Sequence, residues 1–207
     1  MGEVPLQFAP GDDAEELSRA ELYGLLAQLW AAAPDRALMQ RLRAAPTAED
    51  PEATLSHPWR NLVSAISASS AEEVADEFDA LFQGVGKAEV FLYGSYYLTG
   101  LLNERPLVQL RHDLRALGLT REETRGETED HISFVFEVMR YLIAGDDVAV
   151  CNLERQRAFF RAHVQPWVEQ LCEAVVAHPR ARVYRAVAEL TRSFVQVETQ
   201  GFDMLET

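Results

Sequence analysis

Ionisable side chains are concentrated in one short run, Glu127-Thr-Glu-Asp130-His131, directly before a strongly apolar stretch. Two chemical roles fit this composition. Hydroxyl and carboxylate side chains at a helix start cap free N–H groups and lie favourably in the field of the helix dipole. Alternatively, Asp130 accepts hydrogen bonds from a cationic ligand, and His131 holds that ligand or the local geometry. The run is therefore a candidate helix N-terminus or the polar rim of a peptide groove.

Two aromatic clusters are further candidates for recognition. Phe78, Leu81 and Phe82 share a helix face ahead of Gly84-Val-Gly86, a pattern that also describes ordinary core followed by a glycine stop. Tyr93-Gly-Ser-Tyr-Tyr97 places three tyrosines within five residues, and these cannot all face one core. Some hydroxyls are therefore expected to meet water or a partner, as amphipathic aromatic side chains commonly do.

The sequence lacks the common catalytic and metal-binding motifs that would indicate an enzyme. It has no Glu-x-x-His pair of the di-iron type, no HExxH, no GxSxG and no zinc-type Cys/His spacing. Gly84-Val-Gly-Lys87 is followed by alanine and has the wrong spacing for a phosphate-binding loop. The five histidines are scattered along the chain. We therefore predict no catalytic residue, no metal ligand and no cofactor.

Charge and hydropathy indicate the kind of partner. The chain has 33 acidic and 19 Lys or Arg residues, a formal net charge of −14. Such a field repels nucleic acids and anionic membranes and attracts cationic partners. No apolar run approaches the ~20 residues of a membrane span, and the N-terminus lacks the pattern of a secretory signal. With Cys151 and Cys172 interpreted as reduced structural residues, we expect a cytoplasmic protein without nucleic-acid binding or membrane insertion.

Helical periodicity runs through nearly the whole chain, so an all-α protein of roughly eight or nine helices is predicted. Ser70-Ala-Glu-Glu73 is a capping box, and residues 45–58 resemble a loop. Residues 89–102 lack a second strand to pair with, which favours an irregular entry into a helix. The acidic tail from Glu198 to Thr207 is expected to fray. Predicted helices include 35–44, 59–68, 106–117, 127–144 and 152–163, with others around Leu22–Leu29, behind the capping box, after Pro166 and after Pro179.

Three pieces in a fixed order carry a family resemblance. FDALFQGVGKAEVFLYGSYYLTG, LVQLRHDLRALGL and ETEDHISFVFEVMRYL resemble the central stretch of the TorD/DmsD/NarJ family of molybdoenzyme maturation chaperones. In that family an LF-x-G-x-G turn leads to an aromatic–serine segment, a helix ending in GL, and an E-x-x-D-H motif that opens a long apolar helix. The match covers about residues 74–145. It departs from the family in the glycine turn and before Tyr93, where prolines are missing, and at Thr128, which replaces a common proline.

The resemblance implies a single all-helical domain over 1–207, with an N-terminal part of about 1–83, a hinge of about 84–105 and a C-terminal part of about 106–207. Monomers and domain-swapped homodimers both occur among such proteins. It also implies that the chain binds the twin-arginine signal peptide and apoprotein of a molybdenum oxidoreductase, assists cofactor insertion and delays export. The peptide-binding residues carried over by the resemblance are Phe78, Leu81, Phe82, Tyr93, Ser95, Tyr96, Glu127, Asp130 and His131.

The chemistry of a twin-arginine signal agrees with this assignment, because its head is cationic and its body apolar. We expect Asp130, aided by Glu127 and Glu129, to face the arginines. The aromatic clusters would take the apolar stretch. Three alternatives remain open: a NarJ-like assembly chaperone of a membrane-anchored nitrate reductase, a small helical nucleotide-binding enzyme, and a ligand-sensing helical regulator. The sequence does not identify the client.

Overall fold

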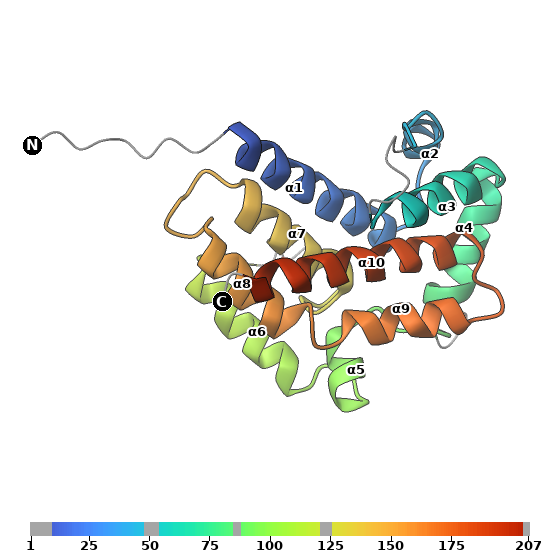
Figure 1. Cartoon of the computed structure of the whole chain (residues 1–207). Helices are drawn as coiled ribbons and strands as arrows, with labels where there is room; N and C mark the ends of the chain where they lie inside the picture. The colour runs from blue at the N-terminus through green and yellow to red at the C-terminus, as the bar shows by residue number, and fades with distance from the viewer. Residues whose placement is uncertain (1–9, 48–53, 85–87, 121–125, 205–207) are drawn as a thin grey trace, which may run out of the picture.

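The computed structural model describes residues 10–47, 54–84, 88–120 and 126–204. Within these ranges it contains ten α-helices, one π-helical turn and no strand, which confirms the all-α prediction with slightly more helices than expected. In chain order (Figure 1) they are α1 Pro10–Ala31, α2 Arg36–Arg43, α3 Ser56–Ser67, α4 Ala71–Phe78, the π turn Asp79–Gln83, α5 Gly94–Thr99, α6 Arg105–Ala116, α7 Ile132–Ala144, α8 Leu153–His163, α9 Val168–Ala177 and α10 Val183–Met204.

Three helices organise the hydrophobic core. α1 packs along α7, while α10 crosses in front of them and packs on α9 and α3 (Figure 1). α7 is central because it is apolar on most of its surface, and seven of its residues are buried. In the core between α1 and α10, the Trp30 indole N–H donates to the hydroxyl of Thr191 (3.0 Å). Helices from both ends of the chain therefore share one core.

Helix starts follow local capping chemistry. The predicted capping box at α4 is confirmed, because the Ser70 hydroxyl accepts from the Glu73 N–H (3.1 Å) and the Glu73 carboxylate accepts from the Ser70 N–H (2.8 Å). Asp35 caps α2 through the N–H of Leu38 (2.7 Å). Asn152 caps α8 in the same way.

Three boundaries differ from the sequence-based prediction. α3 begins at Ser56, so the predicted loop is shorter. α7 begins at Ile132 rather than at Glu127, because His131 provides its N-cap. α10 continues to Met204, so the prediction of a frayed tail from Glu198 was wrong over the described residues, which end at Met204. The physical reason is that Glu198 is buried against a cation, as described below. Of the predicted glycine stop, Gly84 closes the π turn, and residues 85–87 lie outside the described ranges.

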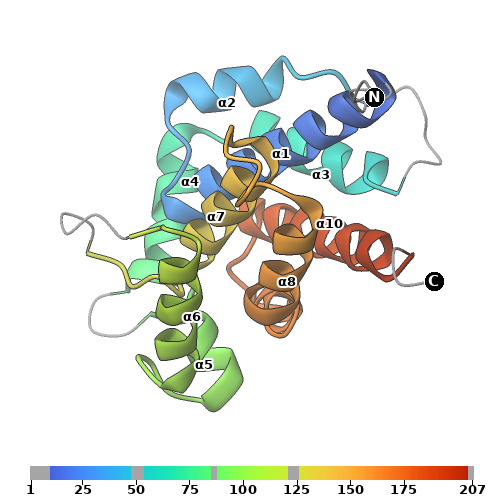
Figure 2. The same cartoon turned by 90° about the vertical axis from the view of Figure 1, so that its left-hand side faces the viewer.

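α5 and α6 lie side by side at the lower edge of the molecule in both views (Figures 1 and 2). The described residues before α5, 88–93, are irregular, as expected for residues 89–102. The hinge role of residues 84–105 stays a prediction. The fold does show that α5 and α6 form a short helix pair at the edge of the molecule. Because residues 88–93 lead into this pair without regular structure, contacts with other segments must hold them in place.

Candidate functional site

Two segments singled out by the sequence meet in the fold. Tyr93 and His131 form an isolated antiparallel bridge. On either side of it, the N–H of Gly94 donates to the carbonyl of Asp130, and the N–H of Ile132 donates to the carbonyl of Leu92 (both 2.9 Å). We call this contact the Tyr93–His131 bridge. It joins the aromatic–serine segment to the acidic run and places both in one site.

Asp130 lies at the centre of this site and is only 4% exposed. Its Oδ2 accepts from the backbone N–H (2.9 Å) and the hydroxyl (2.5 Å) of Ser95, and its Oδ1 accepts from the Thr128 hydroxyl (2.6 Å). Ser95 is in the first turn of α5, whose N-cap residue Tyr93 makes no capping bond with its own side chain. Asp130 therefore does cap a helix, but the helix is α5 rather than the one that follows it.

His131 is the N-cap residue of α7 and is 5% exposed. Its Nδ1 accepts a hydrogen bond from the backbone N–H of Ser133 (3.2 Å), which requires that nitrogen to be unprotonated. Burial lowers the pKa of His131 to about 4, although the negative charges of Glu127 and Asp130 act in the opposite direction. The imidazole is therefore neutral near pH 7, and its role in the site is structural capping.

Tyr93 and Glu127 form the accessible rim of the bridge. The Tyr93 hydroxyl donates to Oε2 of Glu127, a residue that is exposed, and Tyr93 itself is half-buried. Burial, followed by the hydrogen bond and charge of Glu127, raises the pKa of the Tyr93 hydroxyl. Glu129, expected to assist Asp130, is buried and pairs with Arg111 of α6 (2.8 Å). Among the predicted acidic residues, Glu127 is thus the one presented to solvent.

Phe78, Leu81 and Phe82 lie in the hydrophobic core. The rings of Phe78 and Phe82 are 5.1 Å apart, and each packs against Tyr184 of α10. Their link to the bridge is through the backbone, because the carbonyl of Leu81 accepts from the N–H groups of residues 89 and 90 (3.1 and 3.0 Å). These side chains anchor the irregular segment from inside and are not presented at the rim.

The remaining tyrosines follow the expectation that not all can be buried. Tyr96 and Tyr97 are both partly exposed. Tyr96 packs on the ring of Phe91 (4.3 Å between centroids), and Tyr97 stacks on Trp167, the N-cap residue of α9 (5.9 Å). Gly94 allows this close packing, since a Cβ at that position would lie 2.9 Å from the indole of Trp167.

Sequence reasoning missed an exposed apolar surface beside the bridge. Four aliphatic residues of α5, the turn after it and α6 face solvent, and Leu101 and Val108 are 61% and 65% exposed. Leu98 also lines a small cavity of about 110 Å³ that reaches Ser95 and Asp130. The run of leucines around Gly100 was visible in the sequence, but only the fold shows that it is uncovered. We call the following set the α5–α6 surface: Leu98, Leu101, Leu102 and Val108.

Within the described ranges, no group of His, Cys, Asp and Glu is arranged to hold a metal ion. A helix with the length and apolar character needed to cross a membrane is likewise not found there.

Comparison with known proteins places this site in a wider context. A family model described as nitrate reductase delta subunit matches residues 48–173, which is more than half of the chain. This range includes the positions of all nine predicted site residues. A chaperone protein TorD of Vibrio cholerae serotype O1 is 27% identical over 166 residues, covering 74% of this chain and 76% of its own length. The chaperone protein TorD of Aliivibrio fischeri is 25% identical with the same coverage, and that of Photobacterium profundum is 24% identical over 61% of this chain and 62% of its own length.

Proposed function

This chain belongs to the nitrate reductase delta subunit family, and its curated relatives are TorD chaperones rather than enzymes. We propose that it binds the twin-arginine signal peptide and apoprotein of a molybdenum oxidoreductase. Acting in the cytoplasm, it would hold this client until the cofactor is inserted and so delay export. The observation that carries the proposal is that the Tyr93–His131 bridge presents an exposed carboxylate, Glu127, while α5 and the turn after it present exposed leucines, of which Leu98 lines a cavity that reaches Ser95 and Asp130.

The two parts of this site complement the two parts of a signal peptide. The α5–α6 surface offers apolar area to the hydrophobic body, and burial of that area supplies most of the residence time. Tyr96, partly exposed beside it, adds aromatic contact. Glu127 and the overall charge of −14 favour the arginines, which steers the encounter.

The other predicted residues support the site in different ways. Ser95, Asp130 and His131 fix the geometry of α5 and α7 through their hydrogen bonds, and so hold the rim in place. Phe78, Leu81 and Phe82 contribute from the core. They would meet a peptide directly only if the proposed hinge at 84–105 opened. Direct contact in the closed form is therefore assigned to Tyr93, Tyr96, Glu127 and the α5–α6 surface.

The test is calorimetric titration of the purified protein with signal peptides from the host's own molybdoenzymes, at low and high salt. We expect saturable binding to one peptide, weaker at high salt and lost when its arginines are replaced by glutamine. Binding that ignores the arginine replacements would contradict the assignment of the cationic head to Glu127. No binding to any peptide would contradict signal recognition itself.

A second candidate is favoured by the description of the matched family model, nitrate reductase delta subunit. In this case the client would be a membrane-anchored nitrate reductase, recognised through an N-terminal remnant of a signal. Binding of such a remnant peptide in preference to every intact twin-arginine signal would establish this alternative.

A further inference from the structure

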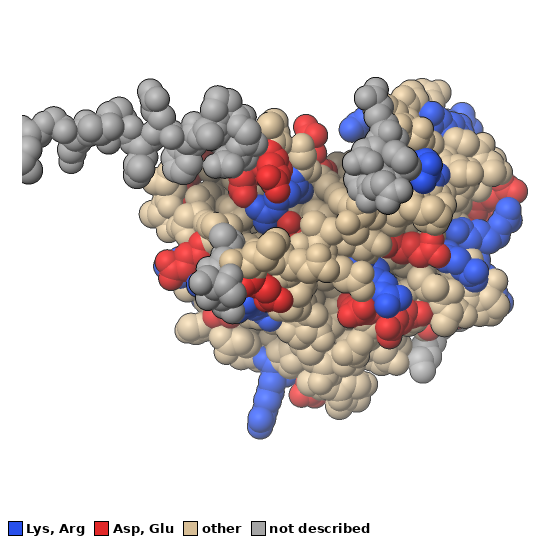
Figure 3. Space-filling model, viewed as in Figure 1, with Lys and Arg blue, Asp and Glu red and all other residues tan. Residues whose placement is uncertain are grey.

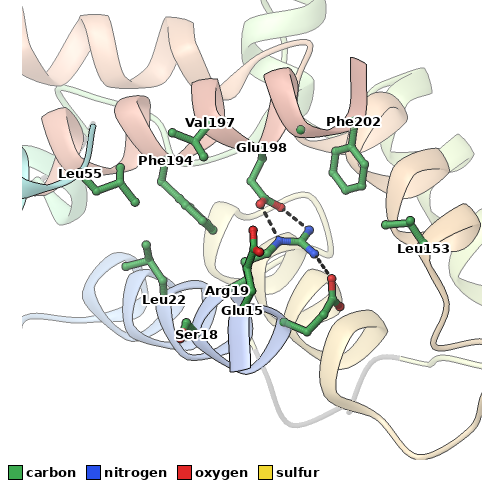
Figure 4. A pocket seen from close by; sticks show the side chains of 12 residues that line it. Glu15, Ser18, Arg19, Leu22, Leu55, Leu153, Phe194, Val197, Glu198 and Phe202 are labelled. Atoms are coloured by element: carbon green, nitrogen blue, oxygen red, sulfur yellow. Dashed lines mark hydrogen bonds and ion pairs between the residues drawn. The ribbon is translucent and has the colours of Figure 1, made fainter. Parts of the chain in front are cut away.

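A second groove lies away from the Tyr93–His131 bridge, between the first half of α1 and the last turns of α10. It encloses about 460 Å³. Leu55 closes one end and Leu153 lies at the other, with the two long helices as walls (Figure 4). In the view of Figure 3, acidic and basic side chains lie together in the hollow between α1 and α10. Most of its lining residues precede or follow residues 48–173, so the family match does not account for it.

The floor of the groove is a buried ionic cluster. The Arg19 guanidinium donates two parallel hydrogen bonds to Glu198 (both 2.8 Å), and Glu198 is 5% exposed. Tyr23 also donates to this carboxylate (3.0 Å). Burial alone would lower the pKa of Arg19, but the hydrogen bond and charge of Glu198 outweigh it, so the pKa is raised. Arg19 therefore stays protonated, and its two hydrogen bonds to Glu198 hold α1 against α10.

This cluster selects the charge of a ligand. Nη1 of Arg19 donates to Glu16 and to Gln156 (3.3 Å to the latter), so each of the three guanidinium nitrogens already donates to a side chain. Glu15 and Glu16 lie at the mouth, so the groove holds three carboxylates and one guanidinium, a formal charge of −2. A cation is therefore favoured over an anion.

Apolar walls flank the charged centre on both sides (Figure 4). Leu22, Leu55 and Phe194 lie on one side of the Arg19–Glu198 pair, and Phe202 and Leu153 lie on the other. Small residues keep the groove open: a Cβ built at Gly201 meets no atom within 4 Å, and Ser18 stands on the opposite helix. Two helical walls with a gap between them match the shape of a third helix.

We propose that this groove docks an amphipathic helix of the client, separate from its signal peptide, whose exposed stripe is apolar, basic and again apolar. The basic residue would meet Glu15 and Glu16 above the Arg19–Glu198 pair, and the flanking apolar residues would fill the two ends. The inference rests on the proposed function for the identity of the partner. If the client engages both surfaces, the two contacts reinforce one another through effective concentration.

The test uses a synthetic helical peptide of about 15 residues, or about four turns, with leucines flanking a central lysine on one face. Its binding is followed by fluorescence anisotropy. Gly201→Leu fills the open space without a positive φ to oppose it, and Ser18→Leu fills the groove from α1. Gln200→Leu, on an exposed position outside the groove, is the matched control.

We expect saturable binding of the peptide to the unmodified protein. Gly201→Leu and Ser18→Leu should each weaken this binding by at least about tenfold, and Gln200→Leu should leave it unchanged. Replacing the peptide's lysine by glutamate, or Glu15 by lysine, should also weaken binding. The proposal would be overturned if the peptide showed no saturable binding, or if it bound Gly201→Leu and Ser18→Leu as tightly as the unmodified protein.

Two further measurements separate this groove from other uses. Titration of the signal peptide against Gly201→Leu should give unchanged affinity, and a parallel loss would make the groove part of the signal site. Light scattering should give the same mass for the unmodified protein and for Gly201→Leu. A dimer that is present in the unmodified protein and lost in Gly201→Leu would identify a second copy of this chain as the occupant of the groove. Either result overturns the proposal. If only the signal peptide failed to bind, the proposed function would be contradicted, but the anisotropy titration with the helical peptide would still test the groove.

Discussion

Oδ2 of Asp130 accepts hydrogen bonds from both the backbone N–H and the hydroxyl of Ser95, a residue 35 positions earlier in the chain. This contact ties the start of α5 to the entrance of α7. An acidic residue in such a motif invites a role in binding arginine directly. Its burial and the three hydrogen bonds that it accepts instead assign it to the geometry of the site.

Asp130→Ala is expected to lower the free energy of unfolding by about 3 kcal/mol, because it leaves two buried donors of Ser95 and the Thr128 hydroxyl without an acceptor. Urea denaturation followed by circular dichroism measures this loss. Asp130→Asn should lose less, since an amide oxygen still accepts. An alanine variant of undiminished stability but weakened peptide binding would restore the direct role for Asp130.

Stability should fall on acidification through the titration of His131. Its folded-state pKa of about 4 is lower than the ordinary value of 6.5, so the unfolded chain binds more protons between these values. The gap corresponds to a loss of up to about 3 kcal/mol, fully developed near pH 4 and absent above about pH 6.5. Urea denaturation across this range is the measurement.

Two variants serve as controls for this pH dependence. His131→Gln should flatten the slope, because glutamine does not titrate. Burial also lowers the pKa of His163 against the opposing hydrogen bond and charge of Asp113, so His163 adds to the loss of stability on acidification and His163→Gln should reduce the slope separately. An unchanged slope in His131→Gln would show that its imidazole does not titrate as inferred.

Leu101→Asp is expected to weaken signal-peptide binding by about tenfold, because it replaces an exposed leucine of the α5–α6 surface by a charge. Stability should change by less than about 0.5 kcal/mol, as for most exposed positions. Val148→Asp is the matched control, since Val148 is also strongly exposed but belongs to the segment between α7 and α8. Equal effects of both variants on calorimetric binding would refute a specific role for the surface.

Glu198→Ala is expected to cost about 3–5 kcal/mol of unfolding free energy, because it leaves the Arg19 guanidinium buried without its main partner. The double variant Arg19→Met/Glu198→Leu should recover much of this loss, since it removes both charges together. Denaturant unfolding of the two variants measures the difference. Equal stability of single and double variants would show that the pair is not coupled.

The helices and several caps could be predicted because their causes are local in the sequence. Ser70 and Glu73 are three residues apart, and Asp35 caps the helix that directly follows it. The family resemblance assigned the aromatic–serine segment and the acidic run to one set of peptide-binding residues, but the backbone bridge between them was not predicted. Hydrophobic residues at helical spacing, however, do not reveal which of them a neighbouring element covers. Phe82, which is buried, and Leu101, which is exposed, could therefore not be told apart from their spacing in the sequence.

Contacts between distant segments account for the predictions that failed or were missed. Glu198 was expected in a frayed tail, and it is instead buried by a cation 179 positions earlier. Nothing near Glu198 in the sequence signals that partner. Asp130 was expected either to face the arginines of a peptide or to cap the helix that follows it, whereas its carboxylate accepts two hydrogen bonds from Ser95, 35 positions earlier.

The shortness of α5 has a thermodynamic consequence. A helix of six residues does not persist alone in water, so α5 exists only while Asp130 and the bridge hold its first turn. The exposed leucines of α5 and of the turn after it, Leu98, Leu101 and Leu102, keep their positions only in that same state. Apparent affinity for a peptide is therefore the intrinsic affinity scaled by the fraction of molecules in which α5 is formed. Anything that shifts this fraction tunes client capture without touching a single contact residue.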